Sequence, residues 1–359
     1  MYREPTRSNL SFRRMPSPKL VFAVVAILAA AIFTCAGDRR ATTRVGRQPD
    51  GSYIVSTQQR VRAGSIPFNA RPSDMAMHPT GTYVAVLNQA SILLISPQGM
   101  LADSHTWLGS AAGFRGVAWS PDGNRLFASC ASGYEQELRF NGGHLQLHAR
   151  IDVTPEGSKG NPRPGGMAIT RNGKRLYVAL TDRNSVAEVD LDTSRMIRTF
   201  RVQNLPFEVR LSRDENTLVV SNWGGRTAAD NDERSESGNA VVVVDPRGAA
   251  ASGTVCLIRR DNGANKVVNV GIHPTAIAVD GDHAYVTNSA SDSITDIKVS
   301  ARKVVRTLPL RWGKMNLFGS MPCAIAIRNG VAYICNGGDN ALCVMHLASG
   351  RVLGFYPAG

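Results

Sequence analysis

The chain has 359 residues, of which 43% are hydrophobic and 19% charged, so it can bury a large core and is not disordered as a whole. Its 34 glycines and its aromatic content of only 6% favour frequent turns over long helices. With 41 Lys and Arg against 28 Asp and Glu, the formal net charge is +13, which favours anionic partners.

The N-terminus has the pattern of a secretory signal. Residues 1–19 are polar and basic, residues 20–33 (LVFAVVAILAAAIF) are uncharged and apolar, and small residues follow up to Gly37. This order of a basic, an apolar and a small-residue region predicts export of the rest of the chain.

We expect residues 1–36 to be a signal peptide or, because the uncharged stretch is barely long enough to span a bilayer, a membrane anchor over residues 20–36. Lipidation of Cys35 is a further alternative. Residues 37–50 then form a linker, and the remainder lies outside the cytoplasm, in the periplasm or secreted. Any membrane contact is made through the N-terminal segment alone.

One sequence unit recurs six times after residue 50. In residues 163–192, RPGGMAITRNGKRLYVALTDRNSVAEVDLD, alternating apolar runs are separated by turns, and Asn172-Gly173 is a tight hairpin signal. Each copy is anchored by a proline, or by Phe114 in the second copy. The anchors are Pro72, Phe114, Pro164, Pro206, Pro274 and Pro322. Four copies end their second run in asparagine, at Asn88, Asn222, Asn288 and Asn336.

The spacing of the anchors, 42 to 68 residues, leaves room for four short strands and loop insertions. Four-stranded units repeated at such a period predict an all-β fold, a β-propeller over residues 51–359. Radial stacking lets each small sheet cover the apolar face of its neighbour. A pair of β-sandwich domains is the alternative.

The repeat resembles the YVTN family of β-propellers. The four residues after which that family is named occur in this chain as Tyr285-Val286-Thr287-Asn288. A closer resemblance, carried by residues 221–226 (SNWGGR), 242–247 (VVVDPR) and 47–51 (RQPDG), is to the YncE-like propeller that precedes an alkaline-phosphatase-superfamily phosphoesterase domain. That resemblance implies a ring of the seven-bladed type. The phosphoesterase part has no counterpart in the sequence.

Six repeats are complete, and we expect a seventh blade that is truncated or only partly closed. A strand at residues 52–55 or 59–61 is suited to contribute to that closure. A six-bladed ring is the alternative.

The loops that enter the first strands and those that follow the second strands are expected on one face, where binding residues gather. Arginine and lysine bind phosphate or carboxylate, and tryptophan offers a stacking surface. The candidate binding residues are Arg71, Arg163, Trp223, Arg226, Arg311, Trp312 and Lys314.

Cofactor and metal signals are weak, so no cofactor is expected. His144 and His148 fall on one predicted strand, too far apart to share an ion. The acidic group Asp230, Asp232 and Glu233 lacks the spacing of a calcium loop and is interpreted as a solvated loop.

Five cysteines follow the leader, so at least one thiol is unpaired. If Asn329-Gly330 is a two-residue turn, Ala324 faces Cys335 and Cys323 is one step away. A disulfide is therefore possible among Cys323, Cys335 and Cys343. Buried free thiols are the alternative.

These features favour a non-catalytic binding or interaction scaffold with an anionic ligand or protein partner. The family resemblance implies a second role, as the accessory module of a phosphoesterase partner. A single nucleic-acid strand suits a basic groove with aromatic residues, but export disfavours it. The alternative is a propeller enzyme, lactonase-like or of another kind, with a site at the channel mouth. Asp74, His78 and Glu208 lie near the expected first strands, although no spacing links them.

Overall fold

A computed structural model describes the chain over residues 44–54, 60–61, 71–106, 112–310 and 319–357. Over these ranges the protein consists of strands joined by turns and loops, and its one helical element is the 3-10 turn η1 (Thr181–Arg183). The described residues contain no helix that is long and apolar enough to cross a membrane. The leader predicted at residues 1–36 lies outside them.

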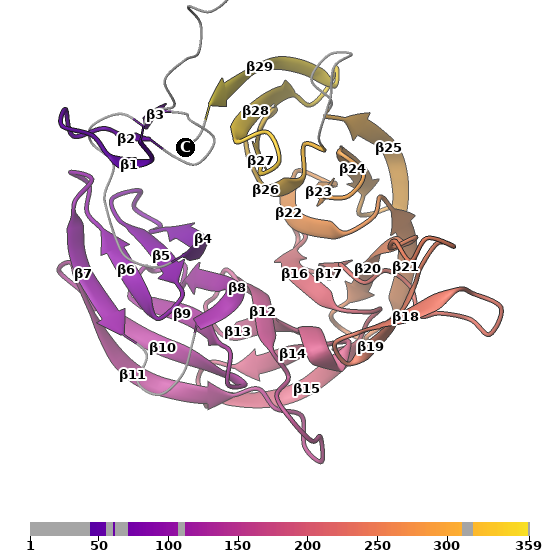
Figure 1. The fold of residues 1–359 in the computed structure, drawn as a ribbon. Helices are drawn as coiled ribbons and strands as arrows, with labels where there is room; N and C mark the ends of the chain where they lie inside the picture. Colours follow the sequence, from indigo (N-terminus) through magenta and orange to yellow (C-terminus); the bar gives the residue numbers. More distant parts are fainter. Residues whose placement is uncertain (1–43, 55–59, 62–70, 107–111, 311–318, 358–359) are drawn as a thin grey trace, which may run out of the picture.

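Six four-stranded antiparallel sheets follow one another along the chain, and each is one blade (Figure 1). Blade 1 comprises β4 (Pro72–Met77), β5 (Val84–Asn88), β6 (Ser91–Ile95) and β7 (Leu101–Thr106). Blade 2 comprises β8 (Ala112–Trp119), β9 (Arg125–Cys130), β10 (Tyr134–Asn141) and β11 (His144–Asp152). Blade 3 comprises β12 (Pro164–Ile169), β13 (Arg175–Leu180), β14 (Ser185–Asp190) and β15 (Arg195–Arg201).

The second half of the ring repeats this arrangement, with one hairpin inserted in blade 4. Blade 4 comprises β16 (Pro206–Leu211), β17 (Thr217–Asn222), β20 (Gly253–Arg259) and β21 (Asn265–Val270). The inserted hairpin comprises β18 (Arg234–Ser237) and β19 (Ala240–Val243). Blade 5 comprises β22 (Pro274–Asp280), β23 (His283–Asn288), β24 (Ser293–Lys298) and β25 (Lys303–Pro309). Blade 6 comprises β26 (Pro322–Arg328), β27 (Val331–Asn336), β28 (Ala341–His346) and β29 (Arg351–Pro357).

The first strand of each blade lies innermost, and the inner strands β4, β8, β12, β16, β22 and β26 pack side by side around a central channel (Figure 1). Five of them begin at the predicted anchor, and β8 begins at Ala112, two residues before Phe114. The predicted all-β propeller of four-stranded blades is therefore confirmed.

Short polar side chains hold the turns between inner and second strands. In blades 2, 3 and 4 a hydroxyl donates a hydrogen bond to the side-chain oxygen two residues on, which holds the turn closed. The pairs are Ser120 with Asp122 at 2.5 Å, Thr170 with Asn172 at 2.7 Å and Ser212 with Asp214 at 2.6 Å. This repeated turn explains why similar short polar segments recur along the sequence.

Consecutive blades bury an apolar core between them. Phe127 of blade 2, for example, packs in one cluster with Met167 and Val178 of blade 3. Four further clusters of this kind join the other neighbouring blades within the described ranges. Each sheet thus covers its neighbour, as radial stacking requires.

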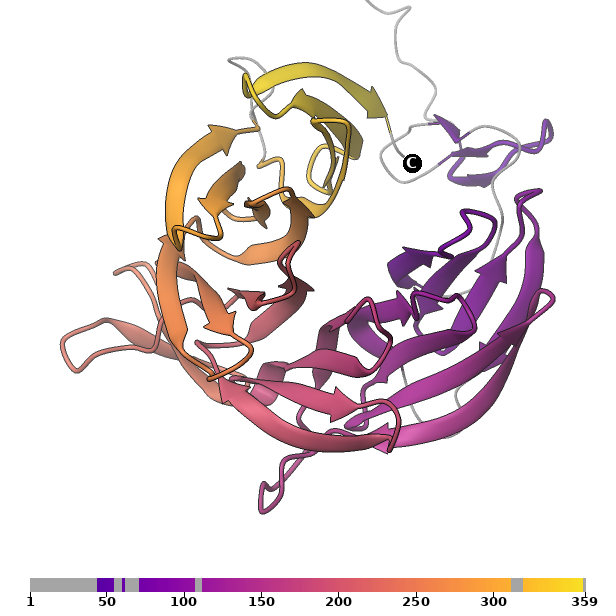
Figure 2. The same ribbon diagram turned by 180° about the vertical axis from the view of Figure 1, so that it is seen from behind.

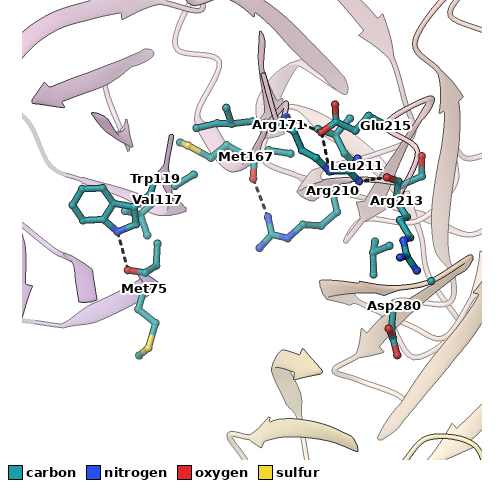
Figure 3. Close-up of a pocket in the computed structure, with 17 residues that line it drawn as sticks. Met75, Val117, Trp119, Met167, Arg171, Arg210, Leu211, Arg213, Glu215 and Asp280 are labelled. Carbon is teal, nitrogen blue, oxygen red and sulfur yellow. Dashed lines mark hydrogen bonds and ion pairs between the residues drawn. The ribbon is translucent and has the colours of Figure 1, made fainter. Parts of the chain in front are cut away.

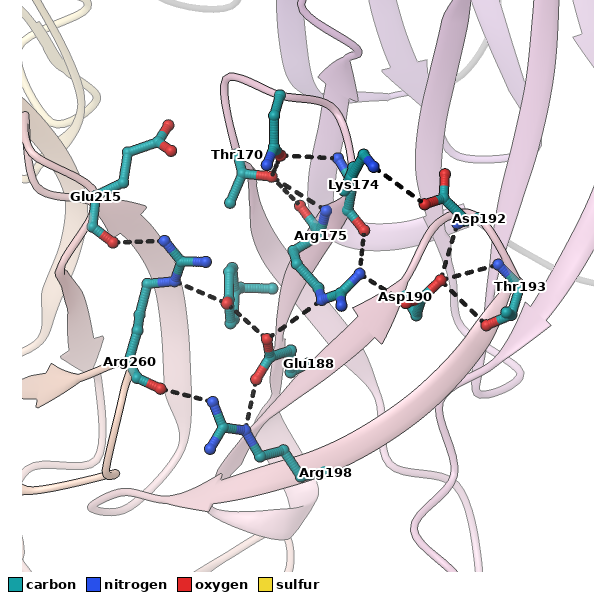
Figure 4. A network of polar contacts seen from close by, with 12 residues as sticks. Thr170, Lys174, Arg175, Glu188, Asp190, Asp192, Thr193, Arg198, Glu215 and Arg260 are labelled. Carbon is teal, nitrogen blue, oxygen red and sulfur yellow. Dashed lines mark hydrogen bonds and ion pairs between the residues drawn. The ribbon is translucent and has the colours of Figure 1, made fainter.

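A polar network also joins blades 3 and 4 around the buried carboxylate of Glu188 (Figure 4). The Tyr177 hydroxyl donates a 2.8 Å hydrogen bond to Glu188, and Arg198 donates one of 2.6 Å. Arg260 of blade 4 donates a 2.8 Å bond to the Tyr177 oxygen. Burial raises the pKa of Tyr177 to about 12, so the hydroxyl keeps its proton and remains a donor to Glu188 at neutral pH.

Blades 1 and 6 do not close the ring on each other, because β26 and β4 make no contact comparable to those of the other inner strands. A separate sheet of β1 (Gly46–Arg47), β2 (Tyr53–Ile54) and β3 (Arg60–Val61) lies beside the outer part of blade 1 in this sector (Figures 1 and 2). β2 and β3 fall in the two segments predicted to be strands, and β1 lies within the predicted linker. These strands pair with one another and join none of the six blades.

Candidate binding site in the central channel

A repeated loop positions the residues at the start of the inner strands. In blades 3 to 6 the residue before the opening proline has a left-handed φ of 49° to 52°, and its carbonyl accepts a backbone hydrogen bond from the loop after the second strand. These residues are Arg163, Leu205, His273 and Met321, and their donors are Thr181, Trp223, Ser289 and Gly337. The two sets of loops therefore meet on one face, as predicted, and we call this face the entry rim.

A cavity of about 320 Å³ opens on the entry rim between blades 2, 3 and 4. Arg163 lies in its wall, 3.4 Å from the carboxylate of Asp182. The rings of Phe114 and Phe207 face the same cavity, with their centroids 5.5 Å apart. Trp223 completes the aromatic lining. The cavity, which we call the entry pocket, thus combines apolar ring surfaces with one ion pair.

Trp223 is also a packing residue between blades 4 and 5. Its ring stacks on the His273 ring with a centroid distance of 3.9 Å and an interplanar angle of 10°. Burial lowers the pKa of His273, which keeps that imidazole neutral and suited to stacking on the indole. A ligand in the entry pocket therefore meets a tryptophan that is already held in place.

A buried charge cluster lies beside the entry pocket. Arg115 on β8 forms an ion pair with Glu208 on β16, and Arg210 binds the other carboxylate oxygen of Glu208. Only 1% of Glu208 and 8% of Arg115 are exposed. Burial by itself lowers the pKa of Arg115, but the negative charges of Glu208 and Asp74 outweigh that effect and raise it. Arg115 therefore stays charged and its charge is compensated inside the protein.

Two glycines of blade 3 make the Arg115–Glu208 pair possible. The pair connects blades 2 and 4 across β12, where Gly165 and Gly166 stand. A Cβ at Gly166 would lie 2.7 Å from the Glu208 carboxylate and 2.8 Å from the Phe207 carbonyl oxygen. Side chains there would therefore push the neighbouring strand away, and the glycines let the two strands approach closely.

The opposite mouth of the channel holds a larger cavity of about 800 Å³, which we call the exit mouth (Figure 3). The inner strands of blades 1 to 5 all contribute to its wall. One side is apolar and includes the exposed Met75 and the ring of Trp119. The indole of Trp119 donates a 3.1 Å hydrogen bond to the Ala76 carbonyl, which fixes its orientation at the mouth.

The other side of the exit mouth is charged (Figure 3). Arg171 is held by Glu215, which accepts its backbone N–H at 2.7 Å, and Arg210 donates a 2.9 Å bond to the Met167 carbonyl. Arg213 is exposed, and within the described part of the chain no side chain pairs with its guanidinium. The mouth therefore offers a cationic group next to an apolar wall.

The structure brings two of the predicted binding residues together, because Arg163 and Trp223 line the same entry pocket. Arg226 lies on the inserted loop, where both of its terminal nitrogens bind Asp232. That contact, with a backbone bond from Ala229, lowers the pKa of Asp232 to about 2. Arg71 is exposed beside the first residue of β4. Arg311, Trp312 and Lys314 lie outside the described residues.

All five described cysteines are free thiols. The predicted hairpin register is confirmed, since Ala324 pairs with Cys335 and the Cys323 thiol donates to the Cys335 carbonyl at 3.4 Å. Cys343 is buried against blade 5, whereas Cys335 is exposed on the other face of the sheet. A disulfide between Cys323 and Cys335 stays a prediction, and Cys343 faces away from both.

Of the three residues considered for an enzyme, Asp74 and Glu208 both lie near Arg115, whereas His78 does not join them. Asp74 accepts the Gly116 N–H at 2.9 Å, and Glu208 binds the two arginines. His78 is buried between blades 1 and 2, where its ring lies 4.7 Å from that of Trp119. Among the described residues, no three His, Cys, Asp or Glu side chains gather with the geometry of a metal site.

Sequence reasoning did not single out Arg115, Arg210 or Arg213. The sequence places Glu208 near a first strand, but the residues close to it in the chain do not indicate that its partner lies in another blade. The signal available was Gly165-Gly166 at the start of an inner strand, which marks a close approach of two backbones.

No protein-family model matches the chain, and no curated protein matches it in sequence. Among solved structures the chain is similar to Hydrazine Synthase of Kuenenia stuttgartiensis, with a TM-score of 0.61 and 18% sequence identity. The match covers 80% of this chain and 87% of that one. At this identity the likeness concerns the fold alone, and with the six blades it places the chain among the β-propeller proteins.

Proposed function

We propose that the chain is an exported, non-catalytic β-propeller that binds a small molecule with an anionic group at the exit mouth. The observation that carries the proposal is the wall of the 800 Å³ cavity, where the inner strands of five blades and the turns after them place Arg171 and Arg213 opposite the exposed Met75. Cavities of this size with an apolar wall and a few polar groups are typical of ligand sites. The guanidinium groups supply paired donors for a carboxylate or phosphate.

The same proposal includes three further points: the YVTN-type assignment, the location outside the cytoplasm and a role beside a phosphoesterase partner. The sequence Tyr285-Val286-Thr287-Asn288 supports the first and the apolar segment at residues 20–36 the second. The third rests on the resemblance carried by residues 221–226, 242–247 and 47–51. The net charge of +13 favours an anionic ligand or protein partner over a cationic one.

Calorimetric titration of the full chain with inorganic phosphate and with succinate tests this function. We expect saturable binding of at least one anion, weakened tenfold or more in the double variant Arg171→Gln, Arg213→Gln. The matched control is Arg247→Gln, because Arg247 is 86% exposed on the blade 4 insertion and pairs with Asp245 outside the mouth. Binding should also weaken as salt rises.

Absence of saturable binding, or equal affinity in the double variant and the control, would refute the proposal. The enzymatic alternative has its own signature. The purified chain would then hydrolyse a chromogenic phosphoester or a lactone. Loss of this activity on changing Asp280 at the same mouth would support the enzymatic alternative instead.

A further inference from the structure

The wall of the entry pocket contains a carboxylate whose charge is poorly compensated. The side chain of Asp182 is 9% exposed, and its Oδ2 lies 3.4 Å from a terminal nitrogen of Arg163, beyond the length of a charge-assisted hydrogen bond. Its Oδ1 is buried and has no hydrogen-bond partner among the described residues. A buried carboxylate oxygen without a donor is costly and uncommon in native folds. This point of the wall therefore lacks a hydrogen-bond donor.

The guanidinium of Arg163 also has donors to spare. Its side chain is 50% exposed, and within the described ranges Asp182 is its one ionic partner. The backbone of Arg163 is held on both sides, because its N–H donates to Asn161 at 2.8 Å and its carbonyl accepts the Thr181 N–H at 3.1 Å. A guanidinium carries five N–H donors in a planar fork. Arg163 can therefore bind a ligand carboxylate while its backbone stays in place.

The apolar part of the pocket consists of rings that other residues already hold in place. The Phe207 ring contacts that of Phe114, and the Arg115 guanidinium lies over it at 5.3 Å from the centroid. Trp223 is fixed by its stack on His273. Rings that are held in this way bind a further ring or a branched chain with little additional loss of side-chain entropy. The pocket is therefore suited to an apolar group that lies close to two charges.

The insertion in blade 4 forms one wall of this pocket. The connection between the second and third strands is at most four residues long in the other five blades, but it comprises residues 223–252 in blade 4. An apolar cluster that includes Leu205 and Val242 packs the insertion against the start of β16. Its turn residue Gly238 lines the pocket, and a Cβ there would lie 3.6 Å from Oδ1 of Asp182. The insertion thus encloses the carboxylate, which strengthens its attraction for a cationic group.

We propose that the entry pocket binds an α-amino acid with an aromatic or branched aliphatic side chain. The α-ammonium donates to Asp182, the α-carboxylate accepts from Arg163, and the side chain lies against Phe114, Phe207 and Trp223. Such a ligand carries both charges on one carbon, which suits two protein groups whose nearest atoms are 3.4 Å apart. A cavity of about 320 Å³ is at the lower end of the range for ligand pockets and suits a molecule of this size. The site is separate from the exit mouth and does not depend on the function proposed there.

Calorimetric titration of the full chain with L-phenylalanine and L-leucine tests the ligand class. We expect saturable binding of at least one of them. Three analogues each lack one recognised part: phenethylamine lacks the carboxylate, 3-phenylpropionate lacks the ammonium group, and glycine lacks the side chain. Each should bind at least about tenfold more weakly than L-phenylalanine, because each loses a charge-assisted hydrogen bond or the contact with the rings.

Two variants distinguish the two ends of the ligand. Asp182→Asn should weaken the binding of L-phenylalanine and phenethylamine at least about tenfold, and that of 3-phenylpropionate not at all. Arg163→Gln should weaken the binding of L-phenylalanine and 3-phenylpropionate, but not that of phenethylamine. Asp192→Asn is the matched control, because Asp192 belongs to the same blade, is 63% exposed and pairs with Lys174 outside the pocket. Thermal unfolding of each variant shows whether it is folded.

Three results would overturn this inference. The first is no saturable binding of either amino acid at millimolar concentration, or equal affinity in Asp182→Asn and the control. The second is binding of 3-phenylpropionate as tight as that of L-phenylalanine, which would assign the pocket to a simple aromatic carboxylate. The third is loss of L-phenylalanine binding in the Arg171→Gln, Arg213→Gln variant alone, which would place the amino acid at the exit mouth. Binding of phosphate or succinate should be the same in Asp182→Asn as in the wild type, so the two sites are tested separately.

Discussion

The guanidinium of Arg115 in blade 2 pairs with the carboxylate of Glu208 in blade 4, although blade 3 stands between them. The pair therefore connects two blades that are not neighbours in the ring, through the space left by Gly165 and Gly166. Neighbouring blades bury apolar clusters between them, whereas this contact is ionic and lies next to the channel.

Removing the Glu208 carboxylate should destabilise the fold strongly. In Glu208→Gln the buried Arg115 loses its ion-pair partner, and we expect a loss of about 3–5 kcal/mol in the free energy of unfolding. Urea denaturation followed by tryptophan fluorescence measures this loss. The double variant Arg115→Met, Glu208→Leu should recover part of it, since it removes the buried unpaired charge of Arg115 but leaves Arg210 without its carboxylate partner. A loss below about 1 kcal/mol in Glu208→Gln would show that Arg115 is solvated.

Gly166→Ala should separate β12 from β16. The added Cβ meets the Phe207 carbonyl and the Glu208 Cα at 2.8 Å, and backbone atoms cannot rotate away. We expect a loss of about 1–3 kcal/mol in the free energy of unfolding. Gly354→Ala on β29 is the matched control, because its Cβ would meet no atom within 4 Å. Equal stability of the two variants would contradict the close approach.

Tyr177→Phe should reveal the network between blades 3 and 4. The variant loses the hydroxyl that joins Glu188 to Arg260, and we expect a loss of about 1–2 kcal/mol at neutral pH. Because burial raises the pKa of Tyr177 from 10.0 to about 12, its contribution is complete below pH 10 and is lost as the pH rises through 12. The stability difference between the wild type and the variant should shrink over that range. A constant difference up to pH 12 would contradict the burial of the hydroxyl.

Asp232→Asn should loosen the insertion in blade 4. Asp232 accepts hydrogen bonds from Arg226 and from the Ala229 N–H, so its replacement should speed amide exchange over residues 226–245 at neutral pH. Asp261→Asn, which removes a pair with Arg259 elsewhere, should not affect this segment.

The same pair predicts an acid response of the wild type. The pKa of Asp232 falls from 3.8 to about 2 on folding, so its stabilising effect is complete above pH 3.8 and is lost as the pH falls towards 2. Pepsin should therefore cut the insertion faster at pH 2 than at pH 3.8, relative to a folding-independent peptide substrate. Equal relative rates would mean that Asp232 does not hold the loop.

Much of the fold was predictable because its determinants are close together in the chain. Period-2 alternation, an opening proline and a short polar turn lie within about twenty residues in each repeat, and they predicted five of the six inner-strand starts. The Asn329-Gly330 turn predicted the register of Ala324 with Cys335 for the same reason. The entry-rim loops were also predicted, since they follow from strand order alone.

What the sequence by itself determined is therefore the blade, its strands and the face on which its loops emerge. The tertiary structure decided which blades meet and at what angle, and this placed Arg115 against Glu208 and brought Arg163 and Trp223 to one pocket. The physical reason is that strand and turn formation depends on neighbours along the chain. Ring geometry instead depends on the summed packing of five apolar interfaces, which no single repeat encodes.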